Sequence, residues 1–176
     1  MNGIEFKQQF LKLLPEVPKE LEAELKLGEF LEFNAEVLET EKLNEIDIKF
    51  LIEGGLPCEA APFLNFNAYT TTEITELRND YNLKSNYFPL GHDGSGNPIV
   101  IDKESNEIIY LDHDNNMNKV LINSSLPFFA ESLCLYQKNW ANKSMLNCLK
   151  EIEAIDPSLK NIKAMWFYET KVDRNG

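Results

Sequence analysis

Histidine and cysteine are scarce in this chain, and basic residues are strongly outnumbered. Its 176 residues include two histidines and three cysteines, and 17 basic side chains stand against 29 acidic ones, for a net charge of −12. Cys58, Cys134 and Cys148 form no C-x-x-C pair, so neither a disulfide scaffold nor a zinc knuckle is expected. The excess of acid disfavours contact with nucleic-acid phosphates. We therefore expect no nucleic-acid partner, no metal and no other cofactor.

Long apolar runs are also missing. No stretch approaches the roughly 18 consecutive apolar residues of a membrane-spanning helix, and residues 1–16 lack the apolar core of a signal peptide. These absences predict a cytoplasmic protein that does not enter a membrane. The length fits one domain over residues 1–176.

Acidic residues are concentrated in the first two thirds of the chain. Residues 16–118 carry 22 acidic and seven basic side chains, whereas residues 119–176 carry six acidic and eight basic ones. One interpretation is an acidic docking face that attracts a basic partner, with the carboxylates between Glu16 and Asp47 contributing to the attraction. The other is a solvated surface that keeps the protein in solution.

Hydrophobic periodicity and turn residues predict helices at both ends of a sheet. We expect helices over 1–14 and 40–53 (capped by Thr40 and ended by Gly54-Gly55), one that follows Ser124 or Ser125 and includes Trp140, and two more over 143–154 and 157–167. Residues 19–39 have no clear pattern. Ser124 or Ser125 caps the third of these helices, and Trp140 and Trp166 are expected on buried apolar faces.

Residues 87–122 have the clearest strand pattern. Short apolar runs at 86–90, 98–102, 107–112 and 119–123 alternate with turn-forming segments, and a further strand is expected within 63–70. Together these patterns predict an α+β fold with a mixed or mostly antiparallel sheet, a meander over 87–122, and flanking N- and C-terminal helices.

Histidine and aspartate residues follow two of the predicted strands. His92 and Asp93 end the first, and Asp112, His113 and Asp114 end the third. Because alternate strands of a meander run in the same direction, these side chains are expected at one edge of the sheet, roughly 10 Å apart. Such a set offers metal ligands or a general base. Turn chemistry explains the same residues, since Asp, Asn and Gly dominate loops between strands.

Several short motifs occur in a recognisable order. They are Gly55-Leu56-Pro57 after a helix, the apolar run 61–66, the loop of Gly91, Gly94 and Gly96, the junction Asn123-Ser124-Ser125, and Ile155-Asp156-Pro157 with Trp166. In this order they resemble the SUKH superfamily, and within it the fourth SUKH immunity subgroup. The resemblance covers residues 43–167 and leaves 1–40 as an acidic, helical N-terminal extension. Gly54-Gly55 departs from the pattern, which has a single glycine there.

The resemblance implies a function in binding. Members of the superfamily are largely immunity proteins that neutralise toxins of polymorphic or contact-dependent bacterial systems, and they share no catalytic residue. We therefore expect a non-catalytic protein that occludes a cognate toxin, with a basic toxin such as a nuclease favoured by the charge. The candidate partner-binding residues are Glu20, Glu22, Glu24, Glu29, Glu32, Glu36, Asp93, Asp112 and Asp114. A regulatory scaffold and a small metal-dependent hydrolase that uses His92 and His113 stay open as alternatives.

Overall fold

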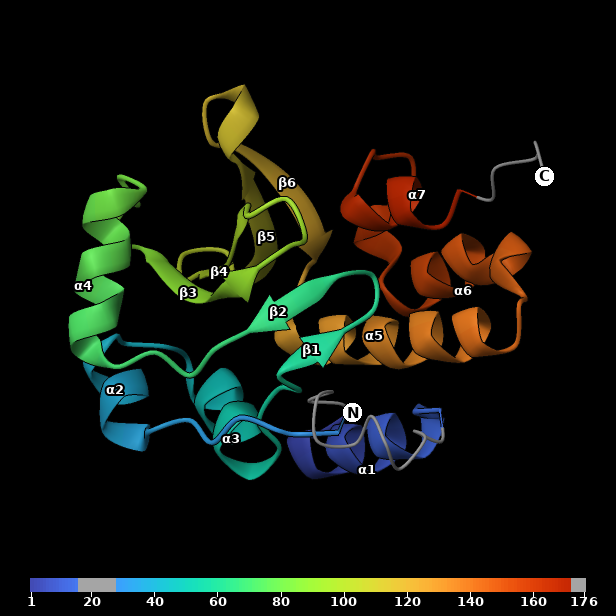
Figure 1. Cartoon of the computed structure of the whole chain (residues 1–176), viewed down its shortest axis with the longest axis horizontal. Helices are drawn as coiled ribbons and strands as arrows, with labels where there is room; N and C mark the ends of the chain where they lie inside the picture. Colours follow the sequence, from blue (N-terminus) through green and yellow to red (C-terminus); the bar gives the residue numbers. More distant parts are fainter. Residues whose placement is uncertain (16–27, 172–176) are drawn as a thin grey trace, which may run out of the picture.

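The computed structural model describes residues 1–15 and 28–171. Its helices and strands follow in this order: α1 (Gly3–Leu13), α2 (Ala35–Thr40), α3 (Glu45–Glu53), β1 (Glu59–Ala60), β2 (Leu64–Phe66), α4 (Thr71–Asp80), β3 (Tyr87–His92), β4 (Pro98–Asp102), β5 (Glu107–Asp112), the 3-10 turn η1 (His113–Asn115), β6 (Asn118–Asn123), α5 (Leu126–Ala141), η2 (Met145–Asn147), α6 (Cys148–Ile155), η3 (Pro157–Leu159) and α7 (Met165–Glu169). Figure 1 shows the sheet between α4 on one side and α5, α6 and α7 on the other.

The six strands form one antiparallel sheet in the order β1-β2-β3-β4-β5-β6. Every neighbouring pair is antiparallel, so the predicted α+β fold with a meander over 87–122 is confirmed, and β1 and β2 extend the meander at one edge. A close approach explains one motif glycine: a Cβ on Gly91 would overlap the carbonyl of Asn65 on β2. A side chain at position 91 would therefore separate β2 from β3.

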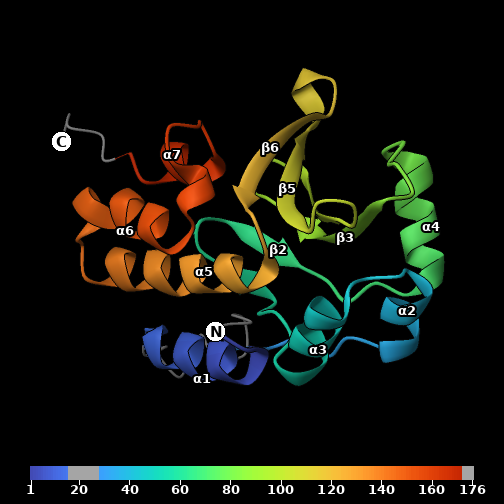
Figure 2. The ribbon, with the colours of Figure 1, turned by 180° about the vertical axis from the view of Figure 1, so that it is seen from behind.

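Both faces of the sheet are covered at its centre. On β4, Ile99 and Ile101 face the main hydrophobic core, while Val100 belongs to a smaller cluster on the other face. This alternation follows from the period of two along a strand. The main core is closed by α5, which packs against α1 and α6, as seen from both sides in Figures 1 and 2.

The sequence patterns were least accurate between residues 35 and 80. Thr40 is the last residue of α2, and α3 begins after Asn44, whose side chain caps it by accepting a hydrogen bond from the Asp47 N–H. The predicted helix 40–53 was therefore wrong at its start. The strand expected within 63–70 is β2, which covers only Leu64–Phe66 of that range. Helix α4, which Thr70 caps, was not predicted at all.

The C-terminal helices follow the sequence more closely, but the helix predicted over 157–167 was wrong: the 3-10 turn η3 ends at Leu159 and α7 begins only at Met165. Ser125 is the N-cap of α5, and Trp166 on α7 is fully buried. Trp140, predicted to be buried, is 57% exposed, although Gln137 and Asn139 beside it in the last turn of α5 are buried. The helix expected over 143–154 starts as a 3-10 turn and becomes α-helical at Cys148. Over residues 1–15 and 28–171, no helix has the length and apolar character needed to cross a membrane.

Candidate interaction surface

A hydrogen-bonded loop joins two of the sequence-predicted site segments. The carboxylate of Asp93 accepts hydrogen bonds from the backbone N–H groups of Ser95 and Asn97 and from Asn97 Nδ2, each at 2.9 Å. Asn97 Oδ1 in turn accepts from the His113 N–H at 3.0 Å and lies 2.7 Å from His113 Nδ1. Asn97 is 8% exposed and bonds to both segments, so this network holds the β3–β4 loop against the end of β5. The sequence predicted that the segments at Asp93 and His113 would lie at one edge of the sheet, and in the structure both bond to the side chain of Asn97.

The two imidazoles make loop hydrogen bonds. His92 Nδ1 lies 3.0 Å from the carbonyl oxygen of Asp93, and the His113 ring contacts Asn97. In the part of the chain that the structure describes, no group of three His, Cys, Asp or Glu residues is placed to hold a metal ion. The arrangement at this edge fixes the loops in place.

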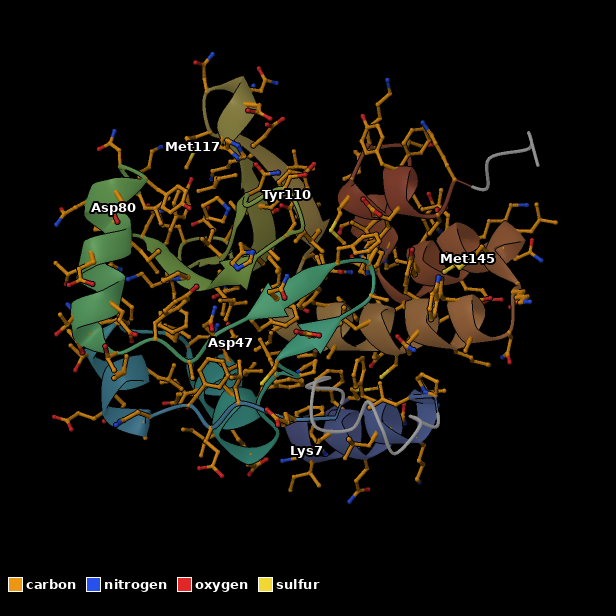
Figure 3. All side chains as sticks on the ribbon, in the orientation of Figure 1. Lys7, Asp47, Asp80, Tyr110, Met117 and Met145 are labelled. Atoms are coloured by element: carbon orange, nitrogen blue, oxygen red, sulfur yellow. The ribbon has the colours of Figure 1, made fainter. Side chains whose placement is uncertain are left out.

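Three carboxylates from separate parts of the chain act on Tyr110 through their negative charge. Burial raises the pKa of Tyr110, and the negative charges of Asp112, Asp93 and Glu169 raise it further. Burial also raises the pKa of Glu169, and the charge of Asp93 adds to this effect. Among the described residues, neither Asp112 nor Glu169 forms an ion pair. We call Asp93, Asp112 and Glu169 the acidic edge; Tyr110, on which their charges act, is labelled in Figure 3.

Other acidic side chains are buried and form ion pairs inside the fold. Glu41 is 8% exposed and holds Arg78 Nη1 at 2.9 Å and Lys103 Nζ at 3.2 Å; burial raises its pKa, but these two cations outweigh burial and lower it overall. Asp102 is 2% exposed and pairs with Lys119 Nζ at 2.6 Å. Of the carboxylates between Glu16 and Asp47 that we expected to attract a partner, Glu41 and Asp47 are therefore buried, at 8% and 2% exposed.

The remaining predicted acids divide into two groups. Glu29 and Glu32 are exposed on the segment that leads into α2, and Glu36 is exposed in the first turn of α2. Asp114 is exposed beside the acidic edge. Figures 1 and 2 both show the segment before α2 on the opposite side of the molecule from the η1 turn, so the fold does not bring these groups together. Glu20, Glu22 and Glu24 lie outside the described residues.

The junction motif and the C-terminal motif form one buried polar network. Trp166 Nε1 donates to Asn123 Oδ1 at 2.9 Å, and Asn123 Nδ2 donates to Ser132 Oγ at 3.0 Å and to Asp156 Oδ2 at 3.1 Å. The Ser124 N–H donates to the same Asp156 oxygen at 2.7 Å. Buried polar groups are costly unless they are paired, and here each is satisfied by another motif residue. The network ties β6, α5, α6 and α7 together.

The glycine motifs also act on the backbone. Gly55 follows α3 with φ +69°, a left-handed conformation that glycine adopts without strain. The chain then turns so that the Leu31 N–H donates to the Leu56 carbonyl at 2.8 Å and Phe30 pairs with Pro57. Gly54, the first glycine of the pair, is also required by packing, because a Cβ on it would overlap the backbone of Gly3 in α1.

In the β3–β4 loop, Gly96 donates its N–H to the Asp93 carbonyl at 3.0 Å, and Gly94 lies against Phe63.

The thiols offer no activated nucleophile among the buried cysteines. Burial raises the pKa of Cys134 to about 12 and that of Cys148 to about 11. Both groups are protonated at neutral pH, which removes the thiolate that nucleophilic chemistry requires.

Sequence reasoning missed several residues of this surface. Glu169 reaches the acidic edge, and acts on Tyr110, through the packing of α7 on the sheet. The sequence carries no local signal for that packing. Phe63 is 82% exposed. Strand alternation could have indicated this, because Leu64 and Phe66 face the core and the residue before Leu64 points the other way.

These features define an antiparallel α+β domain whose motif residues hold the fold and whose surface carries uncompensated acid. The family model described as SUKH-4 immunity protein matches residues 17–165. The chain therefore belongs to the SUKH-4 immunity protein family. The match begins well before residue 43, where the motif resemblance started. No curated protein and no solved structure matches this chain.

Proposed function

We propose that this protein binds a cognate toxin of a bacterial polymorphic or contact-dependent system in the cytoplasm and neutralises it by occlusion, without catalysis. The observation that carries the proposal is the family match over residues 17–165. An immunity protein implies a toxin partner, and the network of motif residues supports a role for those residues in the fold instead of in chemistry.

The charge distribution favours a basic toxin domain, such as a nuclease. The chain carries a net charge of −12, and the acidic edge leaves Asp112 and Glu169 without ion pairs among the described residues. Uncompensated charge of one sign accelerates encounter with a partner of the opposite sign and suppresses like-charged competitors. Association would then proceed by electrostatic attraction followed by burial of a packed interface.

Capture of the partner tests the function directly. Tagged full-length protein is used as bait in a lysate of the source cell, at low and at moderate salt, and bound proteins are named by mass spectrometry. We expect one large toxin in a salt-sensitive complex, and the purified toxin domain should lose its activity at an equimolar amount of this protein. Recovery of ordinary cellular proteins alone, with no toxin, would contradict the proposal and favour a regulatory scaffold.

Charge reversal tests the attraction separately. Asp112→Lys with Asp114→Lys should slow association with the captured toxin domain by about tenfold at low salt and weaken its salt dependence. Glu76→Lys with Asp80→Lys makes the same change in net charge on α4, which is not part of the acidic edge (Asp80 is labelled in Figure 3), and should slow it less. Association rates measured by stopped flow show whether the position of the charge affects the rate. Equal rates for both double variants would show that net charge alone acts, and an unchanged rate would refute steering.

The exposed glutamates before α2 and in its first turn form a second test set. Glu32→Lys with Glu36→Lys removes acid from the other predicted group and leaves the acidic edge intact. A decrease in the association rate larger than that of the Asp112 and Asp114 variant would assign the attraction to this segment.

A further inference from the structure

An apolar groove lies between the β1–β2 hairpin and the C-terminal ends of α1 and α5. It has a volume of about 510 Å³ and is lined by Phe10 and Leu14 from the first helix, by the hairpin residues from 59 to 65, and by Tyr136 and Trp140 from α5. Phe10 and Tyr136 are buried in its base. The hairpin lies along α5 in Figure 1, and α1 packs on α5 from below.

Two aromatic side chains stand at the rim of this groove. Phe63, at the turn of the hairpin, is 82% exposed, and Trp140, in the last turn of α5, is 57% exposed. Phe63 also has φ +54°, a backbone conformation that bulky residues rarely adopt. Each ring leaves a large apolar area in water that burial would remove, and aromatic residues next to a pocket are the usual anchors of protein interfaces.

Acidic side chains flank the groove at the hairpin base. Glu59 lines it and is exposed, and Glu29 lies on the adjoining segment, whose carbonyl accepts a hydrogen bond from the Cys58 N–H at 2.8 Å. None of the described lining residues is basic.

The acidic edge lies at the other end. Phe63 contacts Gly94, the residue after Asp93, and Tyr136 Oη donates to the Glu169 carbonyl at 3.3 Å. The groove is therefore an apolar slot with carboxylates on both sides, which is complementary to an apolar side chain flanked by lysine or arginine.

We propose that this groove, with Phe63 and Trp140 as anchors, is the docking site of the cognate toxin, which inserts an apolar side chain flanked by basic residues. The inference rests on the proposed function and adds the surface and the chemistry of the contact. Among the described residues, Ile46 and Leu146 are also strongly exposed, at 68% and 76%, and do not line the groove, so they serve as controls of similar exposure.

Photocrosslinking in the source cell locates the contact. The full-length protein carries p-benzoyl-L-phenylalanine at position 63 or 140, or at the control positions 46 or 146, and crosslinked products are named by mass spectrometry. We expect the toxin to be crosslinked from positions 63 and 140 and not from the controls. Three results would overturn the groove as the docking site and leave the proposed function standing. They are toxin crosslinked from the control positions, toxin crosslinked equally from all four positions, and no crosslinked toxin from any position while the wild type still captures it.

Two other outcomes are equally decisive. A second copy of this chain crosslinked at positions 63 and 140 would assign the groove to a dimer contact and overturn the inference. Failure of the wild-type protein to capture any toxin would overturn the function and the inference together.

Affinity measurements give the size of the contribution. Phe63→Ser and Trp140→Ser should each weaken binding of the captured toxin domain by about tenfold to a hundredfold, as expected for interface anchors. Ile46→Ser and Leu146→Ser should leave it within about twofold. Because all four side chains are exposed, the unfolding transition of each variant should stay close to that of the wild type, which separates lost contact from lost fold. Unchanged affinity for both groove variants would refute the proposal.

Discussion

Asp47 gives the sharpest prediction about stability. Its side chain is 2% exposed in the first turn of α3 (Figure 3), and its carboxylate accepts one side-chain hydrogen bond, from Asn44 Nδ2 at 2.6 Å. No cation pairs with it among the described residues. Burial raises the pKa of Asp47 from 3.8 to about 6, and the Asn44 amide opposes this only in part.

The pH dependence follows from that pKa. Below pH 4 the carboxyl group is protonated in both the folded and the unfolded chain, so burial of charge costs nothing. Above pH 6 the folded chain holds a buried carboxylate that the unfolded chain would hydrate. At about 1.4 kcal/mol per pKa unit, the cost at neutral pH reaches ~3 kcal/mol. The folded state binds the proton more tightly, so this cost grows as the pH rises from about 4 to 6.

Asp47→Asn removes the charge and keeps an oxygen for Asn44 Nδ2. We expect the variant to be more stable than the wild type by about 1–3 kcal/mol at pH 8, with the difference vanishing near pH 4. Urea unfolding of both proteins across this pH range measures it, because all other titrating groups cancel in the difference. Glu45→Gln is the matched control: Glu45 is exposed in the same turn, and losing its favourable interaction with the helix dipole should cost ~0.5 kcal/mol at pH 8.

A result of the opposite sign would refute the reasoning. If Asp47→Asn is less stable than the wild type at pH 8, the carboxylate is stabilised in the fold and its pKa is not raised. If the difference between the two proteins does not change with pH, ionisation of Asp47 does not contribute to it.

Two further predictions concern the motif residues. Burial raises the pKa of Asp156, but hydrogen bonds from Ser124, Ser158 and Asn123 outweigh burial and lower it, so its contribution is present above the ordinary pKa and lost in acid. Asp156→Asn should therefore cost about 3 kcal/mol in urea unfolding at pH 7 and less at pH 3; an equal cost at both would contradict this. Gly54→Ala should lower stability by about 1–3 kcal/mol, because its methyl group meets the Gly3 backbone, and a neutral substitution would contradict that contact.

Local sequence signals located the sheet because its strands are short and joined by turns. The turn residues of 103–106 and the alternating apolar residues of β4 and β5 place both strands without reference to the rest of the chain. Helix α4 gives a weaker signal, since Ile74 is its one buried residue and its other faces are polar. A helix held by so little apolar surface has no clear periodicity.

The acidic edge could be predicted only in part. Asp93 and Asp112 follow strands whose ends meet in a meander, so their proximity follows from topology. Glu169 joins them because Trp166, buried against Asn123, orients α7 over the sheet. Nothing near residue 169 in the sequence specifies that contact.

The sequence by itself determined the antiparallel sheet, the capped α5 and the excess of acid, because turn residues, caps and charge act over a few neighbouring positions. Only the tertiary structure decided that Trp140 is exposed, that Asp47 is buried and that Phe63 and Trp140 share one groove. Burial depends on which distant element covers a face, and the spacing of residues along one helix or strand does not encode the position of that element.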